Sequence, residues 1–310
     1  MASPRTRSGA LFLDRGMGPL FVTPALILLT LVVVGPFFYT IALSFTNLSY
    51  ALPDHGGSFV GFDNYRRLVR SDPVFWDSFK TTLVFVGTAV ADEMLLGFGV
   101  ALLLAGRLAR QRFVLTLVLV PMMLAPVTIG LIGKLMLQGE FGLATYYLRQ
   151  IGILGEQTAM LSDPKLALVA IVVLDVWQWT PFVTLVLLAG MLGLPREPYE
   201  AAIMDGASRA RILWDITLPL LRPIIGLVLL LRSIDAFKEF DKVFVLTGGG
   251  PGTATELLSI YTYRVNFREW DLGYGAVCAF MVYLVVLILS SLFYKAISRR
   301  DRTADRAVDR

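Results

Sequence analysis

Long apolar stretches, separated by short polar connections, run through the whole chain. The hydrocarbon core of a bilayer is about 30 Å thick and is crossed by a helix of about 20 apolar residues. Six stretches meet or approach that length: residues 19–45, 79–104, 113–137, 166–192, 218–246 and 273–297. The first exceeds the apolar core of a signal peptide and lacks a small-residue cleavage site, so we expect it to be retained. The pattern predicts an all-α, polytopic membrane protein with six transmembrane helices.

Lysine and arginine are distributed unevenly among the connections between these stretches. Counted together with the adjoining ends of the stretches, the two ends of the chain, the second connection and the fourth connection hold sixteen of them, whereas the other three connections hold eight. Basic residues beside membrane spans favour the cytoplasmic side. We therefore expect residues 1–18 and 298–310 to be cytoplasmic tails that bury no core, residues 19–297 to form the transmembrane domain, and the connection at about 193–219 to be cytoplasmic. The net charge of +4 follows from this asymmetry and gives no reason to expect nucleic-acid binding.

The residue content argues against several kinds of site. The single cysteine, Cys278, lies inside the last apolar stretch and permits no intramolecular disulfide. The single histidine, His55, has no Cys or carboxylate partners at ligand spacing, so we expect no metal and no cofactor bound by this chain. The glycine-rich run 248–252 is not followed by the Lys-Ser or Lys-Thr pair of a phosphate-binding loop. If transport uses ATP, another subunit must bind it.

The fifth apolar stretch concentrates charged residues, which are unfavourable inside a membrane unless they meet a partner or water. Arg232, Asp235, Glu239 and Lys242 recur at spacings of three and four, which places them on one face of a continuous helix. One interpretation is a helix that lines a hydrated translocation path for a polar solute. The other is a set of salt bridges between helices or subunits that fixes the assembly. The sequence does not choose between them.

Polar side chains also occur within two other stretches. The second holds Asp92 and Glu93, and the fourth holds Asp175, Trp177 and Gln178. A tryptophan beside hydrogen-bonding groups suits a sugar ring, whose C–H faces stack on the indole while its hydroxyls pair with Asp or Gln. Core packing around a proline-bent helix is the alternative for each of these residues. We take the three residues of the fourth stretch, with the four of the fifth, as the candidate translocation path.

The connection between the fourth and fifth stretches has a distinctive pattern of small residues. It reads Glu-Ala-Ala, three residues, Gly206, nine residues, and then Ile-x-Leu-Pro ending at Pro219. Small side chains let another protein approach the backbone closely, and Gly206 can close a short helix in the left-handed conformation. The pattern resembles the EAA loop of the permeases of ATP-binding-cassette (ABC) importers. The resemblance implies a coupling helix that contacts an ATPase subunit through Glu200, Ala201, Ala202, Asp205, Gly206 and Ala207.

Four further segments resemble the carbohydrate branch of these permeases, the relatives of the maltose and glycerol-phosphate permeases. They are residues 59–65, 233–237, 240–241 and 245–251. The resemblance implies the type I ABC importer permease (MetI-like) fold and a location in the inner membrane of a bacterium or archaeon. It implies a transport subunit, not an enzyme, that carries a sugar, polyol, sugar derivative or glycerol phosphate. The implied partners are a second homologous permease, two ATPase subunits that bind ATP and Mg, an extracytoplasmic solute-binding protein and the lipid bilayer.

Three alternatives remain open at this point. An ABC permease for amino acids, peptides or an oxyanion would share the EAA-like loop, although it would not be expected to share the outer and fifth-stretch segments. An ion-coupled secondary transporter would use the intramembrane carboxylates, but it would need neither the loop nor a partner ATPase. A membrane scaffold without transport would use the same charges for assembly alone. The sequence does not identify the solute.

Overall fold

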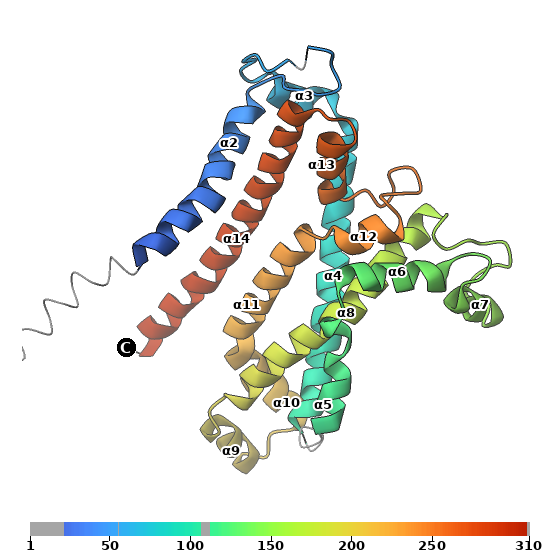
Figure 1. Cartoon of the computed structure of the whole chain (residues 1–310). Coiled ribbons are helices and arrows are strands. Elements are labelled where there is room, and N and C mark those ends of the chain that lie inside the picture. The colour runs from blue at the N-terminus through green and yellow to red at the C-terminus, as the bar shows by residue number, and fades with distance from the viewer. Residues whose placement is uncertain (1–21, 55, 107–111, 309–310) are drawn as a thin grey trace, which may run out of the picture. The chain divides into compact units, whose positions relative to one another are not determined.

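The computed structural model describes residues 22–54, 56–106 and 112–308 as a set of helices joined by short loops (Figure 1). His55 and residues 1–18 lie outside the described residues. The only β-type pairing among the described residues is an isolated bridge between Thr46 and Phe59. The elements are η1 Thr30–Val34, α2 Gly35–Ser44, α3 Asp63–Ser71, α4 Pro73–Ala105, α5 Arg112–Leu119, η3 Pro121–Met123, α6 Pro126–Leu137, α7 Leu143–Gln150, α8 Pro164–Leu192, α9 Glu197–Met204, α10 Arg209–Ile212, η4 Leu213–Thr217, α11 Leu218–Phe237, α12 Asp241–Leu246, α13 Leu258–Phe267 and α14 Leu272–Val308.

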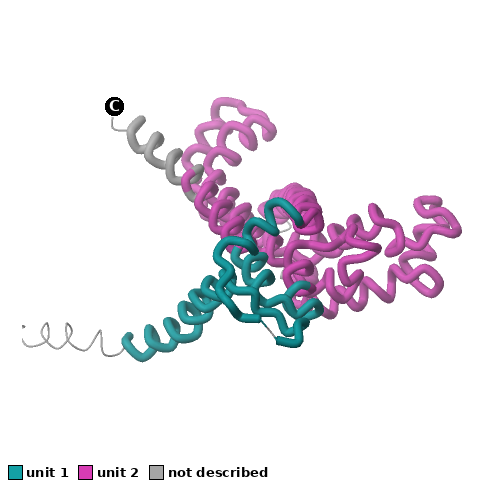
Figure 2. The backbone as a smooth tube through the Cα atoms, turned by 90° about the horizontal axis from the view of Figure 1, so that it is seen from above, with its two compact units in different colours: residues 1–71, 265–280 teal, residues 72–264, 281–310 magenta. Residues whose placement is uncertain are grey.

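The chain forms two compact units (Figure 2). Unit 1 comprises residues 1–71 and 265–280, and unit 2 comprises residues 72–264 and 281–310. Every candidate path residue and the whole EAA-like loop belong to unit 2. These residues therefore all lie within one unit.

Five helical segments are long and apolar enough to cross a membrane, and a shorter apolar helix accompanies them. The long segments are Val22–Ser44, Pro73–Ala105, Pro164–Leu192, Arg209–Leu246 and Leu272–Phe293, and the shorter helix is Pro126–Leu137. This set agrees with the all-helical membrane fold expected from the sequence. The third expected span, residues 113–137, differs because it is divided into α5, η3 and α6.

Two prolines account for the division of the third span. Proline lacks an N–H and forces the residue before it toward extended backbone. Ala125, directly before Pro126, has ψ 137°, and Leu124 has ψ 140°, so the helix cannot continue through them. The interruption leaves the carbonyl of Leu124 without a helical partner, and a side chain from α8 uses it, as described below.

The fifth expected span is also interrupted, which corrects the expectation of one continuous charged helix. Helix α11 ends at Phe237, and α12 begins at Asp241. In the break, the amides of Lys238 and Glu239 bond to carbonyls only three residues back, at 3.1 and 3.2 Å. The carboxylate of Glu239 then accepts the backbone N–H of Lys242 at 3.2 Å and so satisfies a free amide at the start of α12. The Glu239 side chain, which we expected to line the face of one continuous helix, instead caps α12.

The last helix also departs from expectation. Helix α14 continues to Val308, so residues 298–308, expected as a tail separate from the last span, extend that helix. The low apolar content of this segment therefore did not predict its secondary structure.

In unit 1, the segment 59–65 holds the end of α2. The side-chain amide of Asn64 donates to the carbonyls of Ser44 and Thr46, at 3.0 and 2.8 Å, and the Tyr65 hydroxyl lies 2.7 Å from the Ser44 hydroxyl. Gly61 takes φ +59°, which favours glycine in the turn before α3. The sequence segment thus has a structural role, because it satisfies carbonyls that the helix end leaves free.

In unit 2, the most extensive packing joins α4 to α8. Ala89, Glu93, Gly97 and Ala101 recur every four residues along α4 and are all buried. A Cβ on Gly97 would lie 2.7 Å from a methyl carbon of Val183 and 3.2 Å from the backbone nitrogen of Thr184. Small residues along this face let the two helix backbones approach closely, as is common between membrane helices. Glu93 lies on this face and is thereby pointed into the unit.

We predict that Gly97→Ala destabilises the protein by about 1–3 kcal/mol, because the added methyl group overlaps α8. Gly99→Ala is the matched control, since nothing lies within 4 Å of a Cβ at that position of the same helix. Better helix propensity should leave the control equal to or slightly more stable than the parent. Thermal unfolding in detergent measures both changes. Equal melting temperatures for the two variants would contradict the close contact.

Candidate functional site

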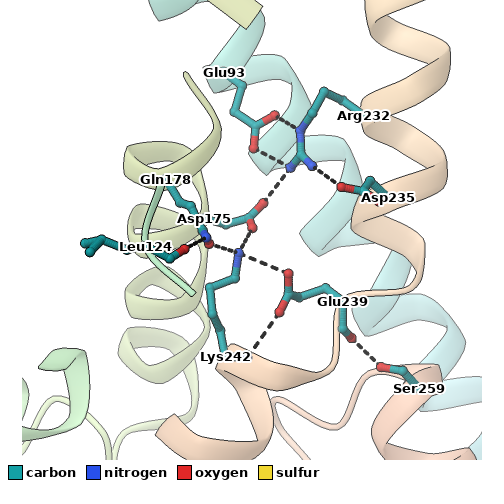
Figure 3. Close-up of polar contacts among 9 residues, drawn as sticks. All are labelled: Glu93, Leu124, Asp175, Gln178, Arg232, Asp235, Glu239, Lys242 and Ser259. Atoms are coloured by element: carbon teal, nitrogen blue, oxygen red, sulfur yellow. Dashed lines mark hydrogen bonds and ion pairs between the residues drawn. The ribbon is translucent and has the colours of Figure 1, made fainter. Parts of the chain in front are cut away.

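A network of charged side chains lies among α4, α8, α11 and α12 (Figure 3). Its first part joins Arg232 of α11 to Glu93 of α4. The guanidinium donates from Nε to Glu93 Oε2 at 2.6 Å and from Nη2 to Glu93 Oε1 at 2.7 Å. This two-point pairing of planar groups is the strongest common form of salt bridge. It fixes the rotation of α11 relative to α4.

Asp175 of α8 connects this pair to a second cation. Its Oδ2 accepts Nη2 of Arg232 at 3.0 Å, and its Oδ1 accepts Nζ of Lys242 in a short contact. Lys242 also donates to Oε1 of Gln178 at 2.9 Å, and Gln178 donates through Nε2 to the carbonyl of Leu124 at 3.1 Å. The Asp175 carboxylate thus joins α11, before the helix break, to α12, after it. The side-chain amide of Gln178 links Lys242 to the interruption between η3 and α6.

Two further carboxylates form what we call the rim, Asp235 and Glu239. Asp235 Oδ2 accepts Nη1 of Arg232 at 3.3 Å, and its Oδ1 lies 3.6 Å from Nζ of Lys238. Glu239 Oε2 lies 3.0 Å from Nζ of Lys242, and the Glu239 carbonyl accepts the Ser259 hydroxyl. The Asp235 side chain is 45% exposed and that of Glu239 is 10% exposed. The rim is therefore the part of the network that solvent reaches.

The remaining four charged groups are almost entirely buried. Side-chain exposure is 0% for Glu93 and Asp175, 1% for Lys242 and 2% for Arg232. Two cations and two anions cancel, and each cation has several acceptors, as burial of charge requires. Trp179 adds its ring face at 4.7 Å from the Arg232 guanidinium carbon. We call these four groups the core of the network.

This geometry bears on both interpretations of the charged stripe. The core groups satisfy one another and are held by helix packing, so they match the interpretation as interhelical salt bridges. The rim groups are more exposed than the core groups, as the interpretation as a polar lining requires. The stripe therefore combines a buried set with a more exposed pair, and one continuous helix face does not describe it.

Glu93 is the network member that was not selected as a path residue from the sequence. Its neighbour Asp92 is exposed, whereas Glu93 is buried. The signal that separates them is the four-residue repeat of Ala89, Glu93 and Gly97, which marks the face of α4 that meets α8. A carboxylate on the small-residue face of α4 meets another helix and can find a partner there. Asp92 lies off that face.

Trp177 does not join Asp175 and Gln178. On a helix, residues three and four apart share a face, whereas residues two apart point to opposite sides. Gln178 and Trp179 accordingly lie with Asp175, and Trp177 faces away. It lines an apolar cavity of about 550 Å³ whose other walls come from α6, α7 and α8. Trp177 therefore does not lie beside these polar groups, contrary to our expectation from the sequence.

The EAA-like loop forms a short helix, a turn and a second short helix. The amide of Ala207 bonds to the carbonyl of Ala202 at 2.9 Å and that of Gly206 to Ile203 at 3.0 Å, which is the Schellman closure of a helix end. Gly206 has φ +74°, as this closure requires. The Ser208 hydroxyl caps α10 by accepting the amide of Arg211 at 3.3 Å. The six residues of the pattern, Glu200, Ala201, Ala202, Asp205, Gly206 and Ala207, therefore lie on α9 and its closing turn.

Helix α9 lies beyond the end of α8 (Figure 1). No residue of α9 is buried. Ile203 is 63% exposed, Met204 86% and Trp214 68%. Large apolar side chains gathered on one exposed loop are typical of a protein interaction surface. The Tyr199 hydroxyl donates to Thr217 at 3.1 Å and so ties α9 to the start of the α11 segment.

The described residues contain no group of three His, Cys, Asp or Glu side chains that could hold a metal ion. The carboxylates of the network are engaged with arginine, lysine and backbone groups instead. The arrangement is thus suited to polar contacts within a membrane.

Comparison with known proteins gives consistent results. The sulfoquinovosyl glycerol transport system permease protein SmoG of Agrobacterium fabrum is 33% identical over 93% of this chain and 92% of its own length. The trehalose/maltose transport system permease protein MalF of Thermococcus litoralis is 35% identical over 90% of this chain and 92% of its own length. A crystal structure of a bacterial ABC transporter involved in the import of alginate contains a chain of the same fold. That chain is 21% identical, with a TM-score of 0.78, over 94% of this chain and 98% of its own.

The family described as the inner membrane component of binding-protein-dependent transport systems matches residues 94–303. This range includes α8, the EAA-like loop, α11, α12 and nearly the whole network. The agreement of family, relatives and fold extends over most of the chain. The protein belongs to this family of ABC transporter permeases.

Proposed function

We propose that this chain is the membrane-spanning subunit of an ATP-driven importer and that its solute is a sugar or a related polar molecule. The observation that carries the proposal is the EAA-like loop, a capped helix and turn that exposes apolar side chains beyond the end of α8. An exposed surface of this kind suits a partner protein on the side of the membrane where the loop lies. The alternative solutes, amino acids, peptides or an oxyanion, have less support, because the relatives are named for carbohydrates.

The proposed assembly contains this chain, a second permease, two ATPase subunits that bind ATP and Mg, and an extracytoplasmic binding protein. The uneven distribution of Lys and Arg supports cytoplasmic termini and a cytoplasmic EAA-like loop. In this assembly Glu200, Ala201, Ala202, Asp205, Gly206 and Ala207 form the surface that receives the ATPase. In this assembly ATP is bound by the ATPase subunits.

Within this assembly, we assign the network two roles. Its core, Glu93, Asp175, Arg232 and Lys242, holds α4, α8, α11 and α12 together. Its rim, Asp235 and Glu239, faces the translocation path, where carboxylate oxygens accept hydrogen bonds from solute hydroxyls. Exposure separates the two groups and supports this division.

Uptake in sealed vesicles tests the proposed function. Vesicles should contain this permease, its partner permease and the ATPase subunits, with the binding protein outside. We expect accumulation of a radiolabelled carbohydrate only with internal ATP and only when every subunit is present. Uptake by this chain alone, driven by a proton or sodium gradient, would favour the secondary-transporter interpretation instead.

A second prediction concerns Gly206. Left-handed backbone costs about 1–2 kcal/mol for residues with a Cβ, and most for β-branched ones, whereas Asn adopts it readily. We expect Gly206→Val to reduce solute-stimulated ATP hydrolysis and uptake together. Gly206→Asn is the control, because a Cβ there has open space within this chain. Normal coupling in a well-expressed Gly206→Val complex would argue against the role of the turn. Failure of Gly206→Asn as well would place a partner directly against this position.

A third prediction compares two neighbouring carboxylates. Glu93→Gln should destabilise the protein by roughly 3 kcal/mol, because Arg232 stays buried with less compensation. Asp92→Asn, one residue away and exposed, should have little effect. Glu93→Gln combined with Arg232→Gln should recover part of the loss, since both charges are then gone. Thermal unfolding and recovery of intact complex measure this series. Equal effects of Glu93→Gln and Asp92→Asn would contradict a structural core.

A further inference from the structure

The charges in and around the network do not balance. Three cations, Arg232, Lys238 and Lys242, meet four carboxylates, those of Glu93, Asp175, Asp235 and Glu239. A fifth carboxylate, Asp241, lies exposed in the first turn of α12. The formal sum over these eight side chains is −2.

The location of this excess negative charge matters more than its magnitude. The four buried core groups cancel among themselves, so the excess lies in the exposed part. Outside the core, Asp235, Glu239 and Asp241 carry three negative charges against the one positive charge of Lys238, whose side chain is 58% exposed and lies 3.6 Å from Asp235. An exposed pair at that distance is weak and screened by water. Asp235 and Glu239 also contact the core cations Arg232 and Lys242, at 3.3 and 3.0 Å. The part of the network that solvent reaches is therefore negative.

Family membership does not determine the charge of the solute. The Thermococcus relative is named for trehalose and maltose, which are uncharged, whereas the structural relative imports alginate, described as an acidic polysaccharide. Carboxylates that line a path repel an anionic solute, and the low dielectric constant of the surrounding protein and membrane strengthens this repulsion. The hydroxyl groups of an uncharged solute can donate hydrogen bonds to the same carboxylate oxygens. The two kinds of solute should therefore differ strongly at the rim.

We propose that the rim selects by charge, so that this permease passes uncharged or cationic carbohydrates and rejects those bearing carboxylate, sulfonate or phosphate groups. The inference rests on the proposed function, because it requires the rim to face the path. Asp235 carries most of the effect, since it is the most exposed of the four network carboxylates. Its nearest cation, Arg232 at 3.3 Å, is already shared with Glu93 and Asp175.

A reporter thiol tests the local charge independently of the preference of the binding protein. Leu231 is 44% exposed and lies one turn before Asp235 on the same face of α11, and Leu227, 47% exposed, lies one turn further away. Each is changed to Cys in a Cys278→Ser background, in the complete transport complex. Its modification rates are measured with a cationic and an anionic methanethiosulfonate of similar size. Thr253→Cys, in an exposed loop, gives the reference ratio.

We expect the cationic reagent to be favoured about ten-fold or more at Leu231→Cys, relative to the Thr253→Cys reference, and less at Leu227→Cys. Asp235→Asn should lower this preference several-fold, and Asp235→Lys should reverse it. Asp215→Asn is the matched control, because it removes an exposed carboxylate from the EAA-like loop and should leave the ratio unchanged.

The outcomes separate the two proposals. A complex that retains ATP-driven uptake but shows no cationic preference, or none that depends on Asp235, would overturn charge selection and leave the importer function intact. Thiols at both positions that neither reagent reaches in a transporting complex would remove the rim from the path and overturn the inference with it. Absence of ATP-driven uptake in the parent complex would instead count against the proposed function. A cationic preference that follows Asp235 supports charge selection.

Discussion

The bridging of two buried cations by Asp175 is the interaction on which the arrangement of unit 2 depends. A charge at membrane depth is tolerated only when its partners are in place, so each ion pair in the network also fixes the helix that carries it. Arg232 fixes α11 against α4 and α8, and Lys242 fixes α12 against α8. Because both cations share one carboxylate, neither segment can shift without disturbing the other.

The helix interruptions are consequences of the same requirement. Backbone groups freed within a membrane need partners from protein or water. The carbonyl of Leu124, which the interruption around Pro121 and Pro126 frees, accepts a hydrogen bond from the Gln178 side chain. The amide of Lys242, which the break after Phe237 frees, donates to the Glu239 carboxylate. A Cβ on Gly130 would lie 3.0 Å from the Lys242 carbonyl, so α6 approaches α12 at this point as well. The irregular backbone at these two helix interruptions is therefore part of the hydrogen-bond network.

The all-helical fold, the stretches that form spans and the loop pattern were predictable because they depend on local residue order. Hydrophobic length indicates a span, and the Glu-Ala-Ala to Pro219 pattern is contiguous. The break at Lys238–Phe240 was not predictable from periodicity, since Arg232, Asp235, Glu239 and Lys242 keep helical spacing across it. Nor was the pairing of Glu93, which lies 139 positions from Arg232 and depends on how α4 meets α11. Trp177 was grouped with Asp175 by nearness in sequence, although helical geometry turns it to the other side.

Helix α11 connects the EAA-like loop with the network, and its two ends are irregular. Its start follows the π-helical segment η4, which Tyr199 of α9 contacts through Thr217, and its end precedes the break before α12. Between them, 20 residues of α-helix extend about 30 Å. A continuous helix transmits displacement along its axis, whereas turns outside regular α-hydrogen bonding are where rotation is absorbed. A displacement of α9 would reach Arg232 along this helix, which contains Pro223 and so lacks one backbone hydrogen bond near its start. The salt bridges of Arg232 with Glu93 and Asp175 are the contacts that this displacement must either preserve or break.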